Sequence, residues 1–385
     1  MSDTHRILAE LVGFDTTSLG SNLALLGAVT DRLDALGVPY HTGADPTGTR
    51  ANLIARIGPE VPGGVVLAAH TDCVPVTGQP WTSDPFVLTA RGDRLYGRGT
   101  TDMKGFLASV LAHLPALVAA PLTRPVILAL TYDEEIGTVG APAAVDLLLA
   151  TQPRPAAVVV GEPTLLHPVT AHKGVRAYTT IVEGRDGHSS QPHLGANALA
   201  AAARIATHID ELARAHRDAA ADPAFDPPYT TFNLATLHAG QAINIIPRRA
   251  ELTWEYRPVP ADDSEAIAAE VARYASEVVL PELRAATGEG SISFRADAVA
   301  RGLAPEPDGA AEALVRRLTG SPVPAGSVPF GTDGGHFQAA GLSTVVCGPG
   351  SIEQAHQPDE WIEVAQLAAC DEMIARLITE LTATA

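Results

Sequence analysis

The sequence has very little lysine, few aromatic residues and much less positive than negative charge. Only two of its 26 basic residues are lysines, Lys104 and Lys173, and 44 acidic residues bring the formal net charge to −18. Binding to nucleic acid requires a basic face that displaces counterions, and an anionic membrane surface also attracts basic residues. We therefore expect neither nucleic acid nor a membrane among the partners of this protein.

The sequence is also poor in cysteine. Its three cysteines cannot all pair within the chain and form no CxxC motif: Cys73, Cys347 and Cys370. Reduced thiols in a cytoplasmic protein are the simplest interpretation. The first 17 residues lack the basic stretch and apolar run of a secretory signal. The most continuous apolar stretch, 106–122, contains His113 and two prolines, so we expect it to fall short of a membrane span.

The length and composition indicate a folded protein of more than one domain. The chain has 385 residues, which is more than one hydrophobic core usually serves. A content of 46% apolar and 18% charged residues excludes intrinsic disorder. Four short apolar runs, separated by helical stretches, end in polar residues: 65–69, 126–130, 158–160 and 344–347. Such runs are typical of buried, largely parallel strands, whose carboxyl ends bind ligands.

A different pattern begins at about residue 175. The order strand, helix, strand, strand, helix, strand is expected over residues 175–183, 199–216, 231–237, 250–256, 264–286 and 292–298. The first pattern resumes after Gly302. We therefore predict an α/β catalytic domain with a mostly parallel sheet, formed by residues 1–174 and 303–385. An α+β domain, 175–302, interrupts it.

Histidines and acids gather after the predicted parallel strands. The candidates are His70 and Asp72, Asp102, the tandem pair Glu134 and Glu135, Glu162, and His356. Each has an ordinary alternative taken alone, such as a buried histidine, a helix cap for Asp102 or a solvated acidic pair. Cys73, next to Asp72, suggests a thiol nucleophile with His70 as its imidazole, but adjacent residues of a strand point to opposite faces.

Taken together, these residues predict a metal site. Mixed histidine and carboxylate ligands suit Zn²⁺, Co²⁺ or Mn²⁺ better than Mg²⁺. There are more candidate ligands than one zinc ion needs, which implies two ions that share a carboxylate and activate water between them. One remaining carboxylate would serve as general base. Patterns that would compete with this interpretation, such as GxSxG, HExxH or a P-loop, do not occur.

Three residues of the predicted insertion are further candidates for catalysis or substrate binding. His188 lies in the Gly-rich segment Gly187-His-Ser-Ser190, where plain turn chemistry is the alternative. Asn244 supplies an amide and Arg257 a guanidinium, the group best suited to a substrate carboxylate. A surface arginine is the alternative for Arg257.

Five segments read together resemble the co-catalytic zinc deacylases and exopeptidases. That family includes acetylornithine deacetylase, succinyl-diaminopimelate desuccinylase, aminoacylase and carboxypeptidase G. The segments are Ala69-His-Thr-Asp72, Gly99-Thr-Thr-Asp-Met-Lys-Gly105, Asp133-Glu-Glu135, Gly161-Glu-Pro-Thr164 and Ala355-His-Gln-Pro358. Within the family, the segments 171–174, 187–190 and 348–359 are most similar to the acetylornithine deacetylases, and the likeness covers nearly the full length.

The resemblance implies a role for each candidate residue near the strand ends. Five ligands would hold two Zn²⁺ ions per subunit, with Co²⁺ as a substitute: His70 and Glu162 on one ion, Glu135 and His356 on the other, and Asp102 bridging both. Glu134 would be the general base, and Asp72 would orient His70.

The resemblance also implies a homodimer made by the inserted domain, whose Gly-His turn reaches the partner's active site. His188 would stabilise the oxyanion, and Asn244 and Arg257 would bind the substrate carboxylate. The implied activity removes the N-acyl group of an N-acyl amino acid, N2-acetyl-L-ornithine in arginine biosynthesis. Succinyl-diaminopimelate desuccinylase, another deacylase or dipeptidase, and a non-catalytic binding protein remain alternatives. The loop Phe330–Phe337 resembles the general family form, which leaves side-chain specificity open.

Overall fold

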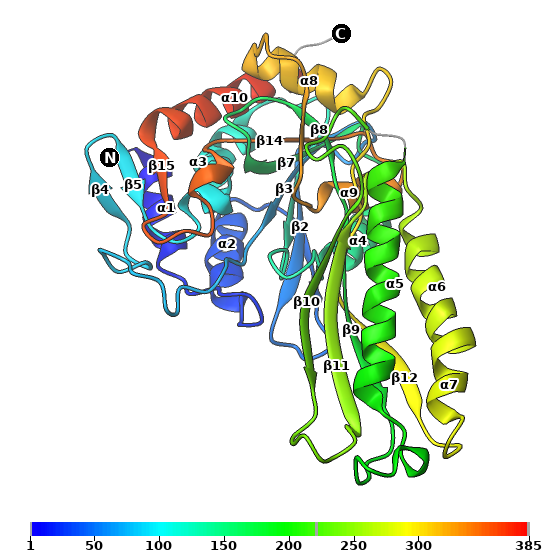
Figure 1. The fold of residues 1–385 in the computed structure, drawn as a ribbon. Coiled ribbons are helices and arrows are strands. Elements are labelled where there is room, and N and C mark those ends of the chain that lie inside the picture. The colour runs from blue at the N-terminus through cyan, green and yellow to red at the C-terminus, as the bar shows by residue number, and fades with distance from the viewer. Residues whose placement is uncertain (1, 220–221, 383–385) are drawn as a thin grey trace. The chain divides into compact units, whose positions relative to one another are not determined.

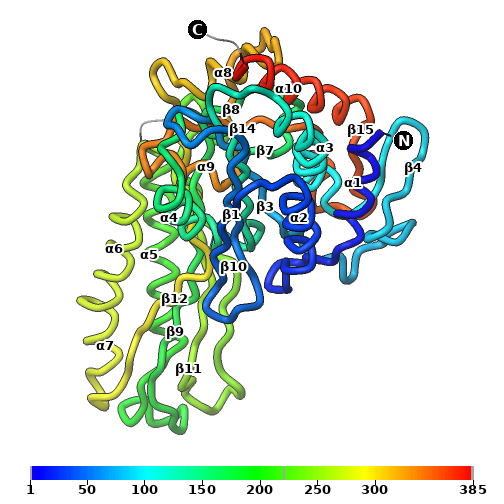
Figure 2. Tube along the Cα trace, turned by 180° about the vertical axis from the view of Figure 1, so that it is seen from behind, coloured from blue at the N-terminus to red at the C-terminus, as the bar shows by residue number. Residues whose placement is uncertain are grey.

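The computed structural model describes residues 2–219 and 222–382. They form two compact units, shown as a ribbon in Figure 1 and as a trace from behind in Figure 2. The larger unit contains the chain up to Ala171, residues 303–327 and the chain from Thr332 onward. The smaller unit contains residues 172–302 and 328–331, so it is inserted into the sequence of the larger one.

The larger unit is built on a sheet of eight strands. Their spatial order is β1 (Tyr40–Ala44), β2 (Ala51–Ile57), β6 (Val126–Thr131), β3 (Val65–His70), β7 (Ala157–Pro163), β14 (Thr344–Gly348), β8 (Val169–His172) and β13 (Gly326–Val328). The central strands β6, β3, β7 and β14 are parallel, and all their residues are buried. Strands covered on both faces read as continuous apolar runs. The predicted α/β class with a mostly parallel central sheet is confirmed.

Helices cover both faces of this sheet. One face shares a hydrophobic core with α1 (Asp3–Val12), α2 (Leu23–Ala35), α3 (Gly105–Ala119), α8 (Ala310–Thr319) and α10 (Val364–Thr382). The other face contacts α4 (Ala141–Thr151) and α9 (Gly334–Ala339). Burial on both sides fixes the strands, and with them the loops that follow their carboxyl ends.

Helix α3 is preceded by an irregular turn, Thr100–Lys104, in which Asp102 and Met103 have non-helical backbone angles. By length and composition alone the stretch Thr100–Ala119 could cross a membrane. However, 67% of the most apolar 18-residue segment of this stretch is buried inside the molecule, and α3 packs against α1 and α10. Its apolar character is accounted for by its position in the core.

Several short strands were not expected from the sequence. Strands β4 (Thr89–Arg91), β5 (Arg94–Tyr96) and β15 (Trp361–Glu363) form a separate antiparallel sheet, and β1 with β2 adds an antiparallel edge to the large sheet. Strands of three residues are too short to show a periodic pattern. The small sheet matters because β15 directly follows the segment that carries His356.

The smaller unit is a four-stranded antiparallel sheet with helices packed on it. The order is β10 (Thr231–Ala239), β11 (Arg249–Arg257), β9 (Val175–Glu183) and β12 (Ser291–Ala300). The helices α5 (Ala198–Asp218), α6 (Ser264–Tyr274) and α7 (Leu280–Arg284) pack against it, and a π-helical turn, Ala275–Val279, joins the last two. These elements follow the predicted strand and helix order closely.

Candidate metal centre

The candidate residues of the larger unit lie where its parallel strands end. His70 is the last residue of β3, Glu162 is the last but one of β7, and Glu134 and Glu135 follow the end of β6. His356 follows β14, and Asp102 lies in the turn before α3. Parallel strands bring their carboxyl ends to one edge of a sheet.

Two glycines allow the approach of β7 to its neighbours. A Cβ atom on Gly161 would lie 2.1 Å from the ring of Phe106, and one on Gly348 would lie 2.0 Å from the carbonyl oxygen of Gly161. Only glycine fits such close approaches of backbone and side chain. Gly161 therefore lets Glu162 reach the edge beneath α3.

Five side chains form two adjoining clusters of possible metal ligands. In the first, Nε2 of His70 lies 3.0 Å from Oδ1 of Asp102 and 3.6 Å from Oε1 of Glu162. In the second, Nε2 of His356 lies 3.2 Å from Oδ2 of Asp102 and 2.8 Å from Oε2 of Glu135. Within each cluster the ligand atoms lie within 4.8 Å of one another. Asp102 belongs to both and presents one oxygen to each.

The donor set fits divalent metal ions. Oε1 of Glu135 is buried and has no hydrogen-bond partner among the described residues. Burial raises the pKa of Glu135 to about 7, and the charge of Asp102 adds to the effect. Burial, followed by the charge of Asp102, also raises the pKa of Glu162 well above its usual range. Crowded buried carboxylates are stable as anions only beside positive charge, which metal ions supply.

Asp72 holds the loop that carries the two tandem glutamates. Its Oδ1 accepts a hydrogen bond from the backbone N–H of Glu134 at 3.0 Å, and its Oδ2 accepts from Glu135 N–H at 3.2 Å. The hydroxyl of Ser18 donates to the same Oδ2 at 2.7 Å. His70 Nδ1 lies 3.0 Å from the backbone carbonyl of Asp72 and 3.5 Å from its carboxylate. Asp72 therefore contacts His70 chiefly through its main chain.

Glu134 lies next to both clusters without belonging to either. Burial raises its pKa well above the usual range, and the charges of Glu162 and Asp333 add to the effect, while His70 opposes it. A carboxyl group with a raised pKa is suited to accept and then release a proton. The preceding residue, Asp133, has a left-handed backbone (φ 51°), accepts from Leu19 N–H at 2.9 Å and forms an ion pair with Arg50. These contacts fix the loop from the other side.

The thiol alternative finds no support in this geometry. Cys73 is fully buried, and burial raises the pKa of its thiol, which disfavours the thiolate. The imidazole of His70 faces carboxylates through Nε2 and the carbonyl of Asp72 through Nδ1. Asp102 does not cap α3 either: Lys104 occupies that position, and no side-chain hydrogen bond caps the helix.

The smaller unit brings two of its three candidate residues together. His188 pairs with Ile245 in an isolated bridge, and Ser189 N–H donates to the carbonyl of Asn244 at 3.0 Å. Arg257 ends β11 and forms an ion pair with Glu255 at 3.1 Å. Asn244 precedes β11, so the nine residues of that strand separate it from Arg257 by roughly 30 Å at about 3.4 Å per residue. One chain therefore cannot bring Asn244 and Arg257 to the same carboxylate.

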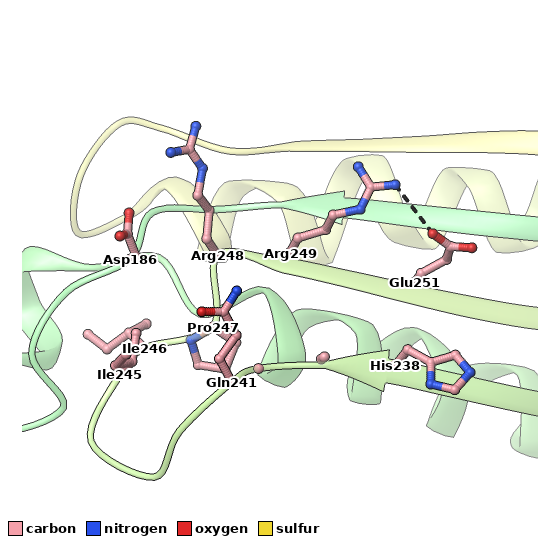
Figure 3. A pocket seen from close by; sticks show the side chains of 11 residues that line it. Asp186, His238, Gln241, Ile245, Ile246, Pro247, Arg248, Arg249 and Glu251 are labelled. Atoms are coloured by element: carbon pink, nitrogen blue, oxygen red, sulfur yellow. Dashed lines mark hydrogen bonds and ion pairs between the residues drawn. The ribbon is translucent and has the colours of Figure 1, made fainter.

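A pocket of about 500 Å³ lies at the Asn244 end of the smaller unit (Figure 3). The connection from β10 to β11 lines it with Gln241, Ile245, Ile246 and Pro247. Arg249, also in the lining, forms ion pairs with Glu251 and Glu183 at 3.3 and 2.7 Å. The pocket thus combines apolar and charged side chains, and it contains none of the metal-ligand candidates.

Sequence reasoning missed residues that support the site from behind. Arg98 and Glu360 form a buried ion pair beside Asp102, and Gln79 contacts the backbone of His356. Asp333 accepts from the hydroxyl of Thr131 at 2.7 Å, and burial raises its pKa to about 6. Glu360 lies four residues after His356, but nothing in a sequence separates a buried supporting acid from an exposed one.

Comparison with known proteins agrees with this geometry. Residues 66–380 match the model of peptidase family M20/M25/M40. Acetylornithine deacetylase of Pectobacterium atrosepticum is 36% identical over 364 residues, which is 93% of this chain and 91% of that protein. Acetylornithine deacetylase of Myxococcus xanthus is 36% identical over 394 residues and covers 98% of each chain.

Solved structures share the fold at low sequence identity. A metallo-carboxypeptidase of the M20 family from Sulfolobus solfataricus matches with a TM-score of 0.73 and 19% identity over 99% of both chains. A dinuclear metal-binding peptidase of the same family from Bacillus subtilis matches with a TM-score of 0.66 and 17% identity, over 98% of this chain and 97% of that one.

Proposed function

The chain belongs to peptidase family M20/M25/M40 and is a metal-dependent hydrolase, and on this premise we propose that it converts N2-acetyl-L-ornithine and water to L-ornithine and acetate. This reaction is a step of arginine biosynthesis. The observation that carries the proposal is Asp102, whose two oxygens face one histidine each beside the buried carboxyl group of Glu134. The acetylornithine deacetylase relatives support the choice of substrate.

We assign two metal ions to each subunit, Zn²⁺ by preference with Co²⁺ as a substitute. His70, Glu162 and Asp102 would hold one ion, and Glu135, His356 and Asp102 the other. When bound, the ions would lower the pKa of water and polarise the acyl carbonyl. Imidazole nitrogens together with carboxylate oxygens are ligands that zinc and cobalt accept.

Glu134 moves the proton in the proposed reaction. Its carboxylate takes a proton from the attacking water and returns it to the leaving nitrogen as the amide bond breaks. The bound cations would counter the repulsion from Glu162 that raises the pKa of Glu134, so the group would be ionised when the reaction starts. Asp72 acts through the backbone N–H groups of Glu134 and Glu135, which it keeps in place.

The smaller unit would serve as lid and dimerisation domain, with domain limits at residues 175 and 302. His188 would donate to the oxyanion, and Asn244 and Arg257 would bind the substrate carboxylate. Arg257 lies where the chain enters the unit, since Arg176 pairs with Tyr256, whereas His188 and Asn244 lie at the far end. We therefore propose that each active site of the dimer receives His188 and Asn244 from one subunit and Arg257 from the other.

Exposed apolar residues support a homodimer made by this unit. They lie on β10, an edge strand, and on the connection to β11: Leu234, Leu237, Ile243 and Ile245. An edge strand offers unpaired N–H and C=O groups that a second copy can pair, and exposed apolar patches mark interaction sites. The partners are then a second copy and a small N-acyl amino acid in the cytoplasm.

A substrate panel with and without metal tests the proposal. The purified protein is assayed with N2-acetyl-L-ornithine, N-succinyl-diaminopimelate, other N-acyl amino acids and dipeptides, in the presence of Zn²⁺ or Co²⁺ and after chelation. We expect the highest kcat/KM for N2-acetyl-L-ornithine, loss of activity on chelation and its return with metal. A higher kcat/KM for another substrate would show that the substrate assignment is wrong. Activity that survives chelation but not thiol alkylation would overturn the mechanism.

A further inference from the structure

Glu360 is a buried carboxylate whose two oxygens accept four hydrogen bonds. Oε2 accepts from Arg98 Nη1 at 2.8 Å and from Gly99 N–H at 2.9 Å. Oε1 accepts from Thr101 N–H at 2.9 Å and from Asp102 N–H at 3.1 Å. Glu360 therefore holds the backbone of the turn that presents Asp102 to both clusters.

Arg98 extends this network to the segment that carries His356. Its Nη1 also lies 3.3 Å from the carbonyl of Gln357, and its Nη2 donates to Oε1 of Gln79 at 2.6 Å. Nε2 of Gln79 in turn donates to the carbonyl of His356 at 2.8 Å. Arg98 thus connects the two ligands that form the second cluster with Glu135.

A second contact fixes Arg98 and Gln79 from the outer side. The guanidinium of Arg98 lies 5.0 Å from the centre of the Trp81 ring, and Trp81 Nε1 donates to Oε1 of Gln79 at 3.0 Å. Stacking on an aromatic face and a planar fork of donors are properties of arginine that lysine lacks. Trp81 and Gln79 therefore fix the orientation in which the Arg98 guanidinium contacts Glu360.

The His356 segment needs such support because its backbone is unfavourable. His356 has φ 64°, and Asp359 has φ 55°. A residue with a Cβ atom adopts the left-handed region only when its surroundings hold it there. The contact from Gln79 to the His356 carbonyl and the contact from Thr82 N–H to Oδ1 of Asp359 at 2.9 Å supply that hold.

Protein stability alone does not account for the buried ion pair of Arg98 and Glu360. Arg98 and Glu360 are each 1% exposed. Removing two charges from water costs free energy that their attraction only partly returns, so a buried ion pair is weak evidence of stability. Here the charges are used instead to fix backbone N–H and C=O groups next to two metal-ligand candidates. Supporting contacts behind metal ligands commonly control metal affinity.

We propose that Gln79, Arg98 and Glu360 form a positioning network that sets Asp102 and His356 in the geometry for metal binding. The inference rests on the dinuclear site proposed above. These three side chains act through the backbones of the ligands, so they are positioning residues and not catalytic ones. Among the metal-ligand candidates, Gln79 contacts only the backbone of His356, whereas Glu360 contacts that of Asp102, which belongs to both clusters. The two residues should therefore affect the two metal ions differently.

Titration of the purified apoprotein with Co²⁺ tests this difference. Co²⁺ binding is followed by its visible absorption for the natural chain, Gln79→Ala and Glu360→Gln, and thermal unfolding of each apoprotein is measured in parallel. Glu306→Gln is the matched control, because Glu306 also accepts from a backbone N–H, that of Thr344, and from a side-chain donor, Gln338. In Glu360→Gln the amide nitrogen, which is itself a donor, would face two of the donors that the carboxylate now accepts from. The amide therefore cannot replace the carboxylate.

We expect two Co²⁺ per natural subunit. Gln79→Ala should weaken one equivalent about tenfold, and Glu360→Gln should weaken both by about tenfold to a hundredfold. Gln79 is only half-buried, so its variant should unfold at the temperature of the natural apoprotein and decides the matter if Glu360→Gln does not fold. Unchanged Co²⁺ affinity in Gln79→Ala, or an equal loss in Glu306→Gln, would overturn the inference. Fewer than two Co²⁺ in the natural protein would instead overturn the dinuclear site.

Discussion

The carboxylate of Asp72 accepts a hydrogen bond from the backbone N–H of Glu134 at 3.0 Å, while its carbonyl lies 3.0 Å from Nδ1 of His70. One residue therefore links a metal-ligand candidate to the loop of the candidate base. Burial acts to raise the pKa of Asp72, but His70, followed by the hydrogen bonds from Ser18 and from Glu134 N–H, lowers it below its usual value. The group remains a carboxylate and can accept all of its donors.

Asp72→Asn should lower kcat by about tenfold to a hundredfold, with little change in bound metal. The amide nitrogen would face the N–H of Glu134 or Glu135, so one of these hydrogen bonds would be lost. Glu134 would then no longer be held in position. Steady-state kinetics and metal analysis check this. Ser18→Ala is the matched control, since it removes one donor and should cost at most about fivefold, the equivalent of one hydrogen bond of about 1 kcal/mol. Equal effects of the two variants would contradict the assigned role.

Glu134→Gln should lower kcat by about a hundredfold or more while metal stays bound. The amide fills the same space but cannot take a proton from water, and Glu134 lies outside both ligand clusters. The metal content of the variant and its kcat on N2-acetyl-L-ornithine are the measurements. Glu60→Gln, a change at an exposed glutamate of the same unit, serves as control and should leave kcat unchanged. A fully active Glu134→Gln would remove Glu134 from the mechanism.

Part of this site could be predicted because parallel strands have a clear sequence signature. Residues 65–69, 126–130 and 158–160 are buried on both faces, so they read as unbroken apolar runs, and the polar residues after them necessarily meet at one edge. His70, Glu135 and Glu162 were found in that way. His356 was found in the same way, after the apolar run 344–347. Asp102 lies in the turn before α3, where a helix cap was an equally good interpretation, and the family likeness implied its bridging role.

Other features could not be predicted because they depend on distances that a sequence does not contain. The ion pair of Arg98 and Glu360 joins residues 262 positions apart, and its burial follows from the packing of the small sheet. Asn244 and Arg257 are only 13 positions apart, yet a full strand separates them. The sequence indicated their chemistry, whereas the structure shows that one subunit cannot use both at one place.

Replacing either lysine with arginine should destabilise the protein by about 1–3 kcal/mol, the usual effect of overpacking a buried site. Nζ of Lys104 donates to the carbonyl of Phe14 at 2.8 Å, and Nζ of Lys173 donates to the carbonyls of Pro227 and Tyr229 at 2.8 and 2.7 Å. Both lysines are at most 1% exposed, and a planar guanidinium does not fit the space of a compact ammonium group.

Urea unfolding of Lys104→Arg and Lys173→Arg provides the measurement. The reverse substitution at an exposed position, Arg217→Lys, should change the free energy of unfolding by less than about 0.5 kcal/mol. If both lysine variants were as stable as the natural chain, the presence of lysine at these two positions would be a coincidence of composition.

His172 should make the smaller unit sensitive to acid. Burial lowers the pKa of His172 to about 4, while its Nδ1 donates to the carbonyl of Lys173 at 2.9 Å. Between the ordinary value of 6.5 and about 4 the unfolded chain binds a proton that the folded chain does not. The free energy of unfolding therefore falls as the pH falls through this range, by about 3 kcal/mol in total at about 1.4 kcal/mol per pH unit.

The buried Trp254 is the only tryptophan of the smaller unit, so its fluorescence in a Trp81→Phe/Trp361→Phe background follows the unfolding of that unit. The measurement compares this background with and without His172→Asn, in the metal-free protein, at pH 7.5 and pH 4.5. Asparagine retains a donor for the Lys173 carbonyl but does not titrate, so the difference between the two proteins isolates His172 from every other group. We expect the protein that retains His172 to lose more stability on acidification than the His172→Asn variant, by about 2 kcal/mol at pH 4.5. Parallel losses in the two proteins would show that His172 is not the acid-sensitive group.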